Sequence, residues 1–256
     1  MRPLSPFRSE LARRAALARQ PRPDGVRGPP LRLLLGEFVT WARLAPRVLD
    51  IAPSRCPQPV MLLPGFGAHP ARMRPMARAL EDAGHTVFDW GLGFNLGPTA
   101  QNFAFLLGRT ASIARLQGAP VALVGWSLGG LFAREIARQL PESVGRVITM
   151  GTPFSGDRRA NNAWRAYQLI TGHRVDEPPI EADFSAKPPV FTTALWSARD
   201  GVVSPRCARG RPGERDRAVA VRCNHLGFAR DPAVIAALLR ELDHEGCPLE
   251  QPAARQ

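Results

Sequence analysis

Lysine is almost missing from this sequence: Lys187 is the only one among 34 basic residues, and the others are arginines. The formal net charge of +12 at pH 7 therefore rests on arginine side chains, which are spread from Arg2 to Arg255. They form no basic stripe interleaved with aromatic residues, and no recognisable nucleic-acid-binding module accompanies them. We interpret the charge as a compositional preference for arginine on solvated surfaces and expect no nucleic-acid partner.

Long apolar runs are also absent. No segment reaches the roughly 18 consecutive apolar residues that a transmembrane helix needs. The first 20 residues hold five arginines but neither an apolar stretch nor a small-residue cleavage site, which argues against a secretory signal peptide. An arginine-rich, acid-poor start also fits an organelle transit peptide or a frayed helix. We expect a cytoplasmic protein, with weak peripheral membrane contact through residues 1–50 as the alternative.

Cysteine is scarce as well. The four cysteines contain no C-x-x-C pair, which excludes zinc-ribbon and thioredoxin-type sites. Cys207 and Cys223 flank one loop, where they could form a disulfide. Free thiols are the default in a reducing cytosol, so the sequence leaves both states open.

The chain divides into four segments by composition. Residues 1–30 are rich in Arg, Pro and Gly, which predicts a flexible basic tail. Residues 31–50 carry apolar residues at helical spacing, which predicts an N-terminal helix. Residues 51–245 form the main domain, and residues 246–256 form a C-terminal tail. The N-terminal helix could lie in a membrane interface, but its modest flanking charge favours packing on its own domain.

Strand and helix patterns alternate through the main domain, which predicts βαβ units. The strands are continuous apolar runs because both faces of a parallel sheet are covered by helices. The expected strands are Val60–Leu63, Thr86–Trp90, Val121–Val124, Val147–Met150, Val190–Trp196 and Ala218–Arg222. The expected helices are Pro70–Ala83, Thr99–Gln117, Leu128–Leu140 and Pro232–Leu242. We predict an α/β fold with a mostly parallel, twisted sheet of about six strands flanked by helices.

One segment, about residues 154–189, interrupts this alternation. It is polar, contains Asn161-Asn162 and ends in Lys-Pro-Pro. We interpret it as a small cap or lid inserted between two strands. Such an insert would shape the substrate pocket.

The run Val121–Gly130 places a serine between a strand and a helix. It contains Gly-Trp-Ser-Leu-Gly, which has the G-x-S-x-G pattern of a nucleophile elbow in the strand-to-helix context that this pattern requires. The turn is so tight that Gly125 and Gly129 must be glycine for neighbouring backbone to approach. Ser127 is then exposed at the carboxyl end of the sheet. A serine that merely caps the helix is the alternative, and the context favours the nucleophile.

A serine hydroxyl needs a base to become a good nucleophile, and the chain has five histidines. His225 follows the last expected strand, and Asp200 follows the strand before it. The order serine, acid, histidine favours Ser127, Asp200 and His225 as a triad in which the acid holds the imidazole tautomer. Taken alone, Asp200 also fits an ordinary Asp-Gly turn. The remaining histidines lie in less suitable places: His69, His85, His173 and His244.

Two backbone amides can complete the site as an oxyanion hole. Acyl transfer passes through a tetrahedral oxyanion, and one donor comes from the loop after the first strand. Glycines in the run Pro64–His69 let that loop turn an amide inward, so we assign one donor to Phe66. The second donor is Leu128, whose amide begins a helix. We expect Trp126, Phe66 and Phe154 to line the mouth of the pocket.

These motifs together resemble those of the α/β-hydrolase superfamily, in particular its lipase-like bacterial esterases. The similarity covers about Pro59–Leu242. The most specific runs are the elbow and Met150-Gly-Thr-Pro-Phe-Ser-Gly. Other similar runs are Leu-Pro-Gly-Phe-Gly, Arg199-Asp-Gly-Val-Val, Asn224-His-Leu-Gly and the run that begins Trp90-Gly-Leu-Gly-Phe-Asn.

The resemblance implies the α/β-hydrolase fold and the triad of Ser127, Asp200 and His225. Two features depart from the family pattern. Pro64 stands before the glycine of the oxyanion loop, where many relatives carry histidine. A helix also takes the place of the usual opening hairpin strands, which predicts a shortened sheet.

We therefore expect a serine hydrolase that cleaves carboxylic, lipid-like esters through an acyl-enzyme, without a metal or organic cofactor. Its partner would be a small-molecule ester or lipid substrate. An acyltransferase that uses the same serine is one alternative. A catalytically silent scaffold of this fold is another, and the presence of a serine, an acid and a histidine argues against it.

Overall fold

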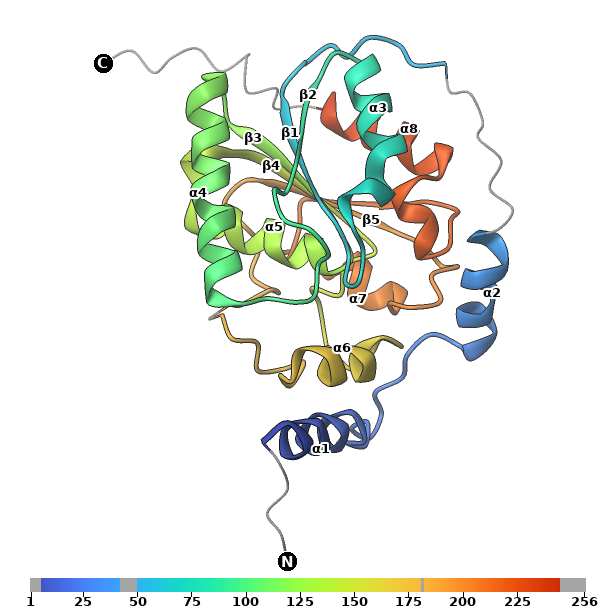
Figure 1. Cartoon of the computed structure of the whole chain (residues 1–256). Helices are drawn as coiled ribbons and strands as arrows, with labels where there is room; N and C mark the ends of the chain where they lie inside the picture. Colours follow the sequence, from blue (N-terminus) through green and yellow to red (C-terminus); the bar gives the residue numbers. More distant parts are fainter. Residues whose placement is uncertain (1–5, 42–49, 181, 245–256) are drawn as a thin grey trace, which may run out of the picture.

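Six parallel strands form the central sheet of the chain, in the order β2-β1-β3-β4-β5-β6 (Figure 1). This computed structural model describes residues 6–41, 50–180 and 182–244. The strands are β1 (Pro59–Leu63), β2 (Thr86–Asp89), β3 (Val121–Trp126), β4 (Val144–Met150), β5 (Phe191–Trp196) and β6 (Arg217–Ala220). Each predicted strand is present within a few residues, and the predicted parallel sheet is confirmed.

Helices cover both faces of this sheet. Helices α3 (Arg74–Asp82) and α8 (Pro232–Leu242) pack on one face, and α4 (Ala100–Gln117) and α5 (Leu128–Gln139) on the other (Figure 1). Successive strand residues point to opposite faces, so each strand supplies two hydrophobic clusters. In β1, for example, Val60 and Leu62 join the cluster with α3 and α8, while the next residues, Met61 and Leu63, join the cluster with α4 and α5.

The remaining elements precede the first strand or lie in the connections between strands and helices. They are α1 (Pro6–Ala18), α2 (Leu31–Trp41), α6 (Trp164–Thr171), α7 (Pro205–Arg209) and the 3-10 turns η1 (Pro70–Met73), η2 (Pro141–Ser143) and η3 (Leu226–Ala229). The predicted helices are confirmed, with η1 and α3 together spanning the predicted helix over Pro70–Ala83. The segment proposed as a cap holds α6 and adds no strand to the sheet.

The composition of residues 1–30 predicts a flexible tail, whereas the structure has a helix, α1, packed against α6 (Figure 1). The guanidinium groups of Arg13 and Arg14 donate hydrogen bonds to the carbonyls of Gly172 and Ile170, at 3.0 and 2.6 Å. Those carbonyls lie at the C-terminal end of α6, where cations are favourable. The contact joins residues more than 150 positions apart, so composition alone does not indicate it.

Helix α2 packs on the domain, as the sequence pattern favours. A Cβ at Gly201 would lie 2.5 Å from the carbonyl oxygen of Leu33, so this glycine lets the backbone of α2 approach the loop after β5. Leu31 and Leu35 are exposed on α2. The predicted continuation to residue 50 lies partly outside the described residues. No helix in the described part of the chain is both long and apolar enough to cross a membrane.

Cys207 and Cys223 are both buried and both carry free thiols. The structure therefore does not contain the disulfide that the sequence left open. Burial raises the pKa of both thiols, because the thiolate loses its solvation there.

The strand order contains one topological switch point, between β1 and β3. From that point the chain adds β2 on one side and β4, β5 and β6 on the other. The loops that leave the carboxyl ends of β1 and β3 therefore diverge, and an open α/β sheet forms its ligand crevice at such a point. The loop that begins at Pro64 and the turn at Ser127 both lie there.

Candidate active site

Ser127 occupies a strained turn between β3 and α5. Its backbone has φ 54° and ψ −118°, and it is the only non-glycine residue with positive φ in the described part of the chain. Its amide donates to the carbonyl of Met150 in β4, at 2.8 Å. Although Ser127 stands at the N-cap position of α5, its side chain makes no capping hydrogen bond. The helix-capping alternative is therefore wrong. A strained backbone of this kind persists only where the surroundings impose it, and it is typical of functional sites.

The neighbouring glycines show what imposes this turn. A Cβ at Gly125 would overlap the backbone of Gly130, and a Cβ at Gly129 would overlap the carbonyl oxygen of Leu63. A Cβ at Gly130 would in turn overlap the side chain of Thr152. The steric requirement predicted for Gly125 and Gly129 is confirmed.

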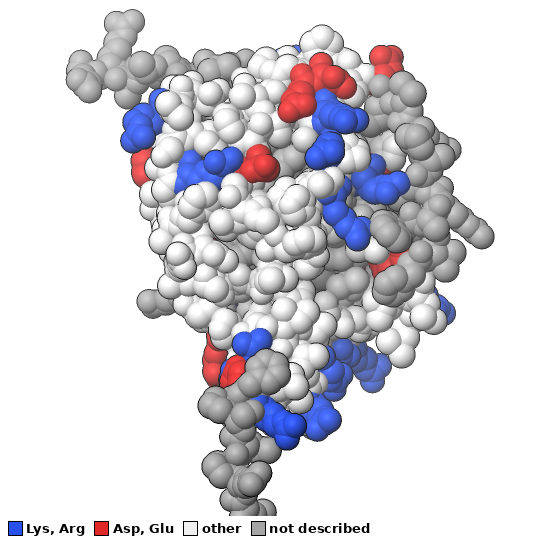
Figure 2. All heavy atoms as spheres, viewed as in Figure 1, with Lys and Arg blue, Asp and Glu red and all other residues white. Residues whose placement is uncertain are grey.

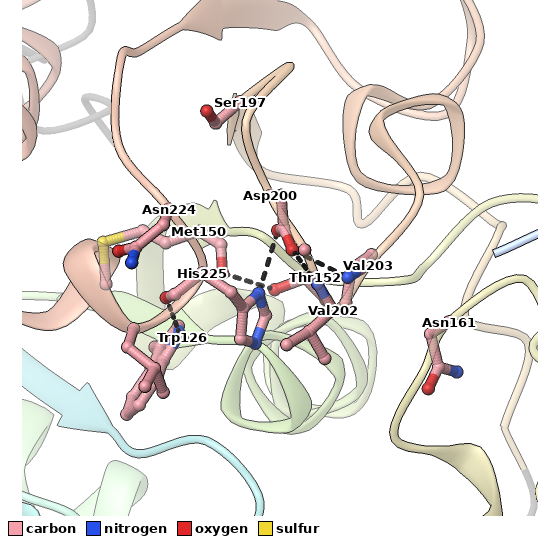
Figure 3. A network of polar contacts seen from close by, with 12 residues as sticks. Trp126, Met150, Thr152, Asn161, Ser197, Asp200, Val202, Val203, Asn224 and His225 are labelled. Atoms are coloured by element: carbon pink, nitrogen blue, oxygen red, sulfur yellow. Dashed lines mark hydrogen bonds and ion pairs between the residues drawn. The ribbon is translucent and has the colours of Figure 1, made fainter. Parts of the chain in front are cut away.

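Asp200 and His225 form a buried, hydrogen-bonded pair, with 2.8 Å between Asp200 Oδ2 and His225 Nδ1 (Figure 3). The other carboxylate oxygen, Oδ1, accepts hydrogen bonds from the amides of Val202 and Val203 at 2.8 and 2.7 Å. Asp200 is thus an Asp-Gly turn residue and a partner of His225 at once. Because a carboxylate only accepts, Nδ1 must donate, which leaves Nε2 of the neutral ring as an acceptor.

The surroundings of His225 favour its protonated form. Burial lowers the pKa of His225, but the charge of Asp200, the hydrogen bond to Asp200 and the charge of Glu37 together outweigh burial. The net shift of the pKa is upward from its ordinary value of 6.5. An imidazole in this setting is a stronger base than a free one.

The loop that carries His225 lies against the elbow. The indole Nε1 of Trp126, the residue before Ser127, donates to the carbonyl oxygen of His225 at 3.1 Å (Figure 3). The rings of Trp126 and His225 are 5.9 Å apart, centroid to centroid. The rings of His225 and Phe228 are 6.2 Å apart, centroid to centroid, and nearly perpendicular. These contacts fix the position of the imidazole beside the β3 turn.

A mostly apolar pocket of about 70 Å³ opens beside Ser127. Phe66 and Leu128, the two predicted oxyanion residues, also line it. The far walls come largely from the insert between β4 and β5, including Trp164, Tyr167 and Phe184. Arg158 and Asn161 contribute the polar side chains of that wall. Burial raises the pKa of Tyr167 to about 12, so its phenol is neutral at ordinary pH.

Two residues that the sequence places at the mouth of the pocket lie elsewhere. Trp126 is 3% exposed and Phe154 is 3% exposed, and neither lines the pocket. Trp126 packs in the cluster with α3 and α8, where its indole N–H reaches His225. Phe154 packs in the opposite cluster, with the Arg134 guanidinium 4.2 Å above its ring. Trp126 is the last residue of β3, and Phe154 lies just after β4. A large apolar surface is buried more favourably in a core than at a pocket mouth.

Glu37 of α2 belongs to this site although no sequence motif indicates it. It is 1% exposed, and its carboxylate accepts hydrogen bonds from the amides of Gly201, His225 and Leu226. A sequence signal does exist: with Leu34 three positions before it and Phe38 and Trp41 following, Glu37 interrupts an apolar helical stripe.

A family model described as the alpha/beta hydrolase fold matches residues 58–184. That range covers β1 to β4, the elbow and α6, and it ends before the loops that carry Asp200 and His225. The chain belongs to the α/β-hydrolase superfamily. The family match supports hydrolase activity. No curated protein matches the sequence.

Solved α/β hydrolases share this arrangement of strands and helices. A structure reported for LipS and LipT, two metagenome-derived lipolytic enzymes, has a TM-score of 0.53 and 17% identity over 76% of this chain and 100% of that one. Lipase BlEst2 from Bacillus licheniformis has a TM-score of 0.54 and 17% identity over 77% and 96%. MGS-MChE2, an alpha/beta hydrolase from a lagoon-sediment metagenome, has a TM-score of 0.52 and 19% identity over 72% and 90%. At these identities the likeness shows the fold.

Proposed function

We propose that this α/β hydrolase cleaves carboxylic esters of apolar acyl groups through an acyl-enzyme on Ser127. The observation that carries the proposal is the strained backbone of Ser127, which holds its side chain at the wall of an apolar pocket. The buried pair of Asp200 and His225 supports it, because that pair supplies a base beside the same turn.

The chemistry follows from these positions in two steps. Ser127 Oγ attacks the ester carbonyl carbon while His225 Nε2 takes the hydroxyl proton, and the amides of Phe66 and Leu128 stabilise the oxyanion. The C–O bond to the alcohol then breaks, and the alkoxide takes the proton from the imidazolium. Water attacks the acyl-enzyme with the same histidine as base, which releases the acid and restores Ser127. The Asp200 carboxylate accepts the hydrogen bond from Nδ1–H throughout, and the proton stays on Nδ1.

The apolar pocket wall favours a substrate with an apolar acyl chain, rather than a charged group, next to the carbonyl. Most side chains around Ser127 are aliphatic or aromatic, and such a wall gains free energy by burying methylene groups. The acyl length that this pocket accepts is best measured with a series of esters.

Hydrolysis of p-nitrophenyl esters of increasing acyl length tests the proposal. We expect turnover by the wild type, and the acyl length at the optimum measures the space beside Ser127. Ser127→Ala should lose activity by about 10³-fold or more. Ser112→Ala, which changes a serine of α4 outside the pocket, should behave as wild type. Mass spectrometry after fluorophosphonate treatment should place one adduct on Ser127. Equal inactivity of wild type and Ser127→Ala across the series, with no adduct, would contradict the proposal.

A further inference from the structure

One buried carboxylate joins the two loops that carry Asp200 and His225. We call residues 197–203 the acid loop and residues 221–226 the histidine loop. Glu37 Oε1 accepts from the amide of Gly201 at 2.8 Å and from the amide of His225 at 2.7 Å. Oε2 accepts from the amide of Leu226 at 2.9 Å. The carboxylate thus contacts the residue after the acid and the backbone of the histidine itself.

The burial of Glu37 makes its hydrogen bonds to the two loops important for stability. An ionised carboxylate removed from water is costly unless hydrogen bonds replace its solvation, and three backbone amides do so here. Gly201 also admits the backbone of α2, with its Cβ position only 2.6 Å from the amide nitrogen of Leu34. The helix and the acid loop are therefore in contact at both backbone and side chain.

We propose that Glu37 is a positioning residue for His225, which fixes the histidine loop against the acid loop and places a second negative charge near the imidazole. The proposal rests on the proposed function in one respect, namely that His225 acts as the base. Glu37 touches neither Ser127 nor the pocket, so it acts through His225 alone.

The charged and titratable groups around His225 determine how the loss of Glu37 would change the pKa of His225. Asp200 faces the ring from the acid loop, and Glu37 faces the histidine backbone from α2. Cys223, two residues earlier, is a neutral thiol whose pKa is raised by burial and also by the charges of Asp231, Asp200 and Glu37. Trp126 and Phe228 contribute uncharged rings. Glu37 and Asp200 are thus the two groups whose charges hold the pKa of His225 up.

Two substitutions separate the charge of Glu37 from its geometry. Glu37→Gln keeps the length, loses the charge and has a single acceptor oxygen for three amides. Glu37→Asp keeps the charge but is one methylene shorter, so it cannot reach both loops. Asp243→Asn is the matched control, because Asp243 likewise accepts from Ser54 Oγ and from the amides of Arg55 and Cys56, before β1 at the opposite end of the strands.

The readouts are the imidazole pKa of His225, followed by NMR without substrate, and kcat and KM on a p-nitrophenyl ester. For Glu37→Gln we expect a lower pKa of His225 and a kcat reduced about 10- to 100-fold, with KM within about threefold. For Glu37→Asp we expect the same loss of kcat with a smaller pKa change. Asp243→Asn should lower the Tm and leave the pKa and kcat unchanged.

A Glu37→Gln protein that matches Asp243→Asn, with a lower Tm but wild-type pKa and kcat, would overturn the proposal. If Glu37→Gln does not fold, a wild-type kcat in Glu37→Asp would overturn it as well. Failure of the proposed function can be told apart from failure of the Glu37 proposal, because it would show as an inactive wild type without a fluorophosphonate adduct. The NMR titration would still decide whether Glu37 controls the pKa of His225.

Discussion

At the level of single residues, Asp200 divides its two carboxylate oxygens between two tasks. Oδ1 is held by the amides of Val202 and Val203, and Oδ2 pairs with His225 Nδ1. The backbone amides of the turn hold the Asp200 carboxylate in place, and the carboxylate in turn holds the His225 ring. The imidazole is thereby kept in one orientation and one tautomer.

Asp200→Asn should reduce kcat about 10³- to 10⁴-fold, because an amide N–H that faces Nδ1 forces the proton onto Nε2. In the wild type, the acid limb of kcat/KM against pH should have its midpoint above 6.5, since the neutral imidazole is the base and its pKa is raised. The variant should move that midpoint to lower pH, because a charge that raises the pKa is gone. Asp89→Asn, at a turn carboxylate that accepts from Gly91, is the control.

Gly129→Ala should prevent the elbow from forming, because its Cβ would overlap the carbonyl of Leu63. We expect loss of activity together with a free energy of unfolding lowered by several kcal/mol, about 2–5. Gly108→Ala offers a contrast within α4, where nothing lies within 4 Å of the new methyl group. It should raise stability by roughly 0.5–1 kcal/mol through helix propensity. Urea denaturation of both variants checks the pair.

At the level of elements, α1 and α2 support the carboxyl end of the sheet from two sides. Helix α1 packs on α6, part of the pocket wall, and α2 packs on the loops that carry Asp200 and His225 (Figure 1). Asn162 links the two regions, because its side-chain amide donates to the carbonyls of Pro29 and Gly201. The position of the pocket wall therefore depends on segments that precede the sheet in sequence.

The double substitution Arg13→Ala with Arg14→Ala should speed amide hydrogen exchange at the C-terminal turn of α6. These side chains hydrogen-bond to the last carbonyls of that helix, and both also pair with Glu10. Because solvent screens these exposed groups, we expect only a small loss of stability for each. Arg8→Ala, an exposed arginine of the same helix, is the control. Unchanged exchange in α6 would show that α1 does not stabilise it.

At the level of the whole molecule, the excess of arginine is spread along the sequence. On the face shown in Figure 2, basic side chains form separate groups, with acidic side chains nearby and uncharged surface between them. A surface of this kind supports solubility and a weak, salt-sensitive attraction to anions. It agrees with the interpretation of the charge as compositional.

Peripheral membrane contact through residues 1–50 stays a prediction. Among the residues of α2 whose side chains are described, the exposed large apolar ones are Leu31 and Leu35, one helical turn apart, at 70% and 69% exposure. We expect weak co-sedimentation of the wild type with anionic vesicles, and less for Leu31→Ser with Leu35→Ser, while ester hydrolysis is retained. Equal binding by both proteins that disappears in high salt would attribute the contact to charge alone.

The sequence by itself determined the sheet and the elbow. Apolar runs and helical spacing locate the strands and helices because these patterns depend on residues a few positions apart. Gly125 and Gly129 report a steric requirement within one turn, which the structure confirms. The order of Ser127, Asp200 and His225 indicated the Asp200–His225 hydrogen bond that the structure contains, while the catalytic roles stay predictions.

Only the tertiary structure decided what these elements pack against. It places Trp126 and Phe154 in the core, gives Cys207 and Cys223 free thiols, and docks α1 on α6. It also brings Glu37 to the amide of His225, 188 positions away. Such contacts follow from how the helices and loops assemble around the sheet, and no periodicity or local motif records a hydrogen bond between distant segments.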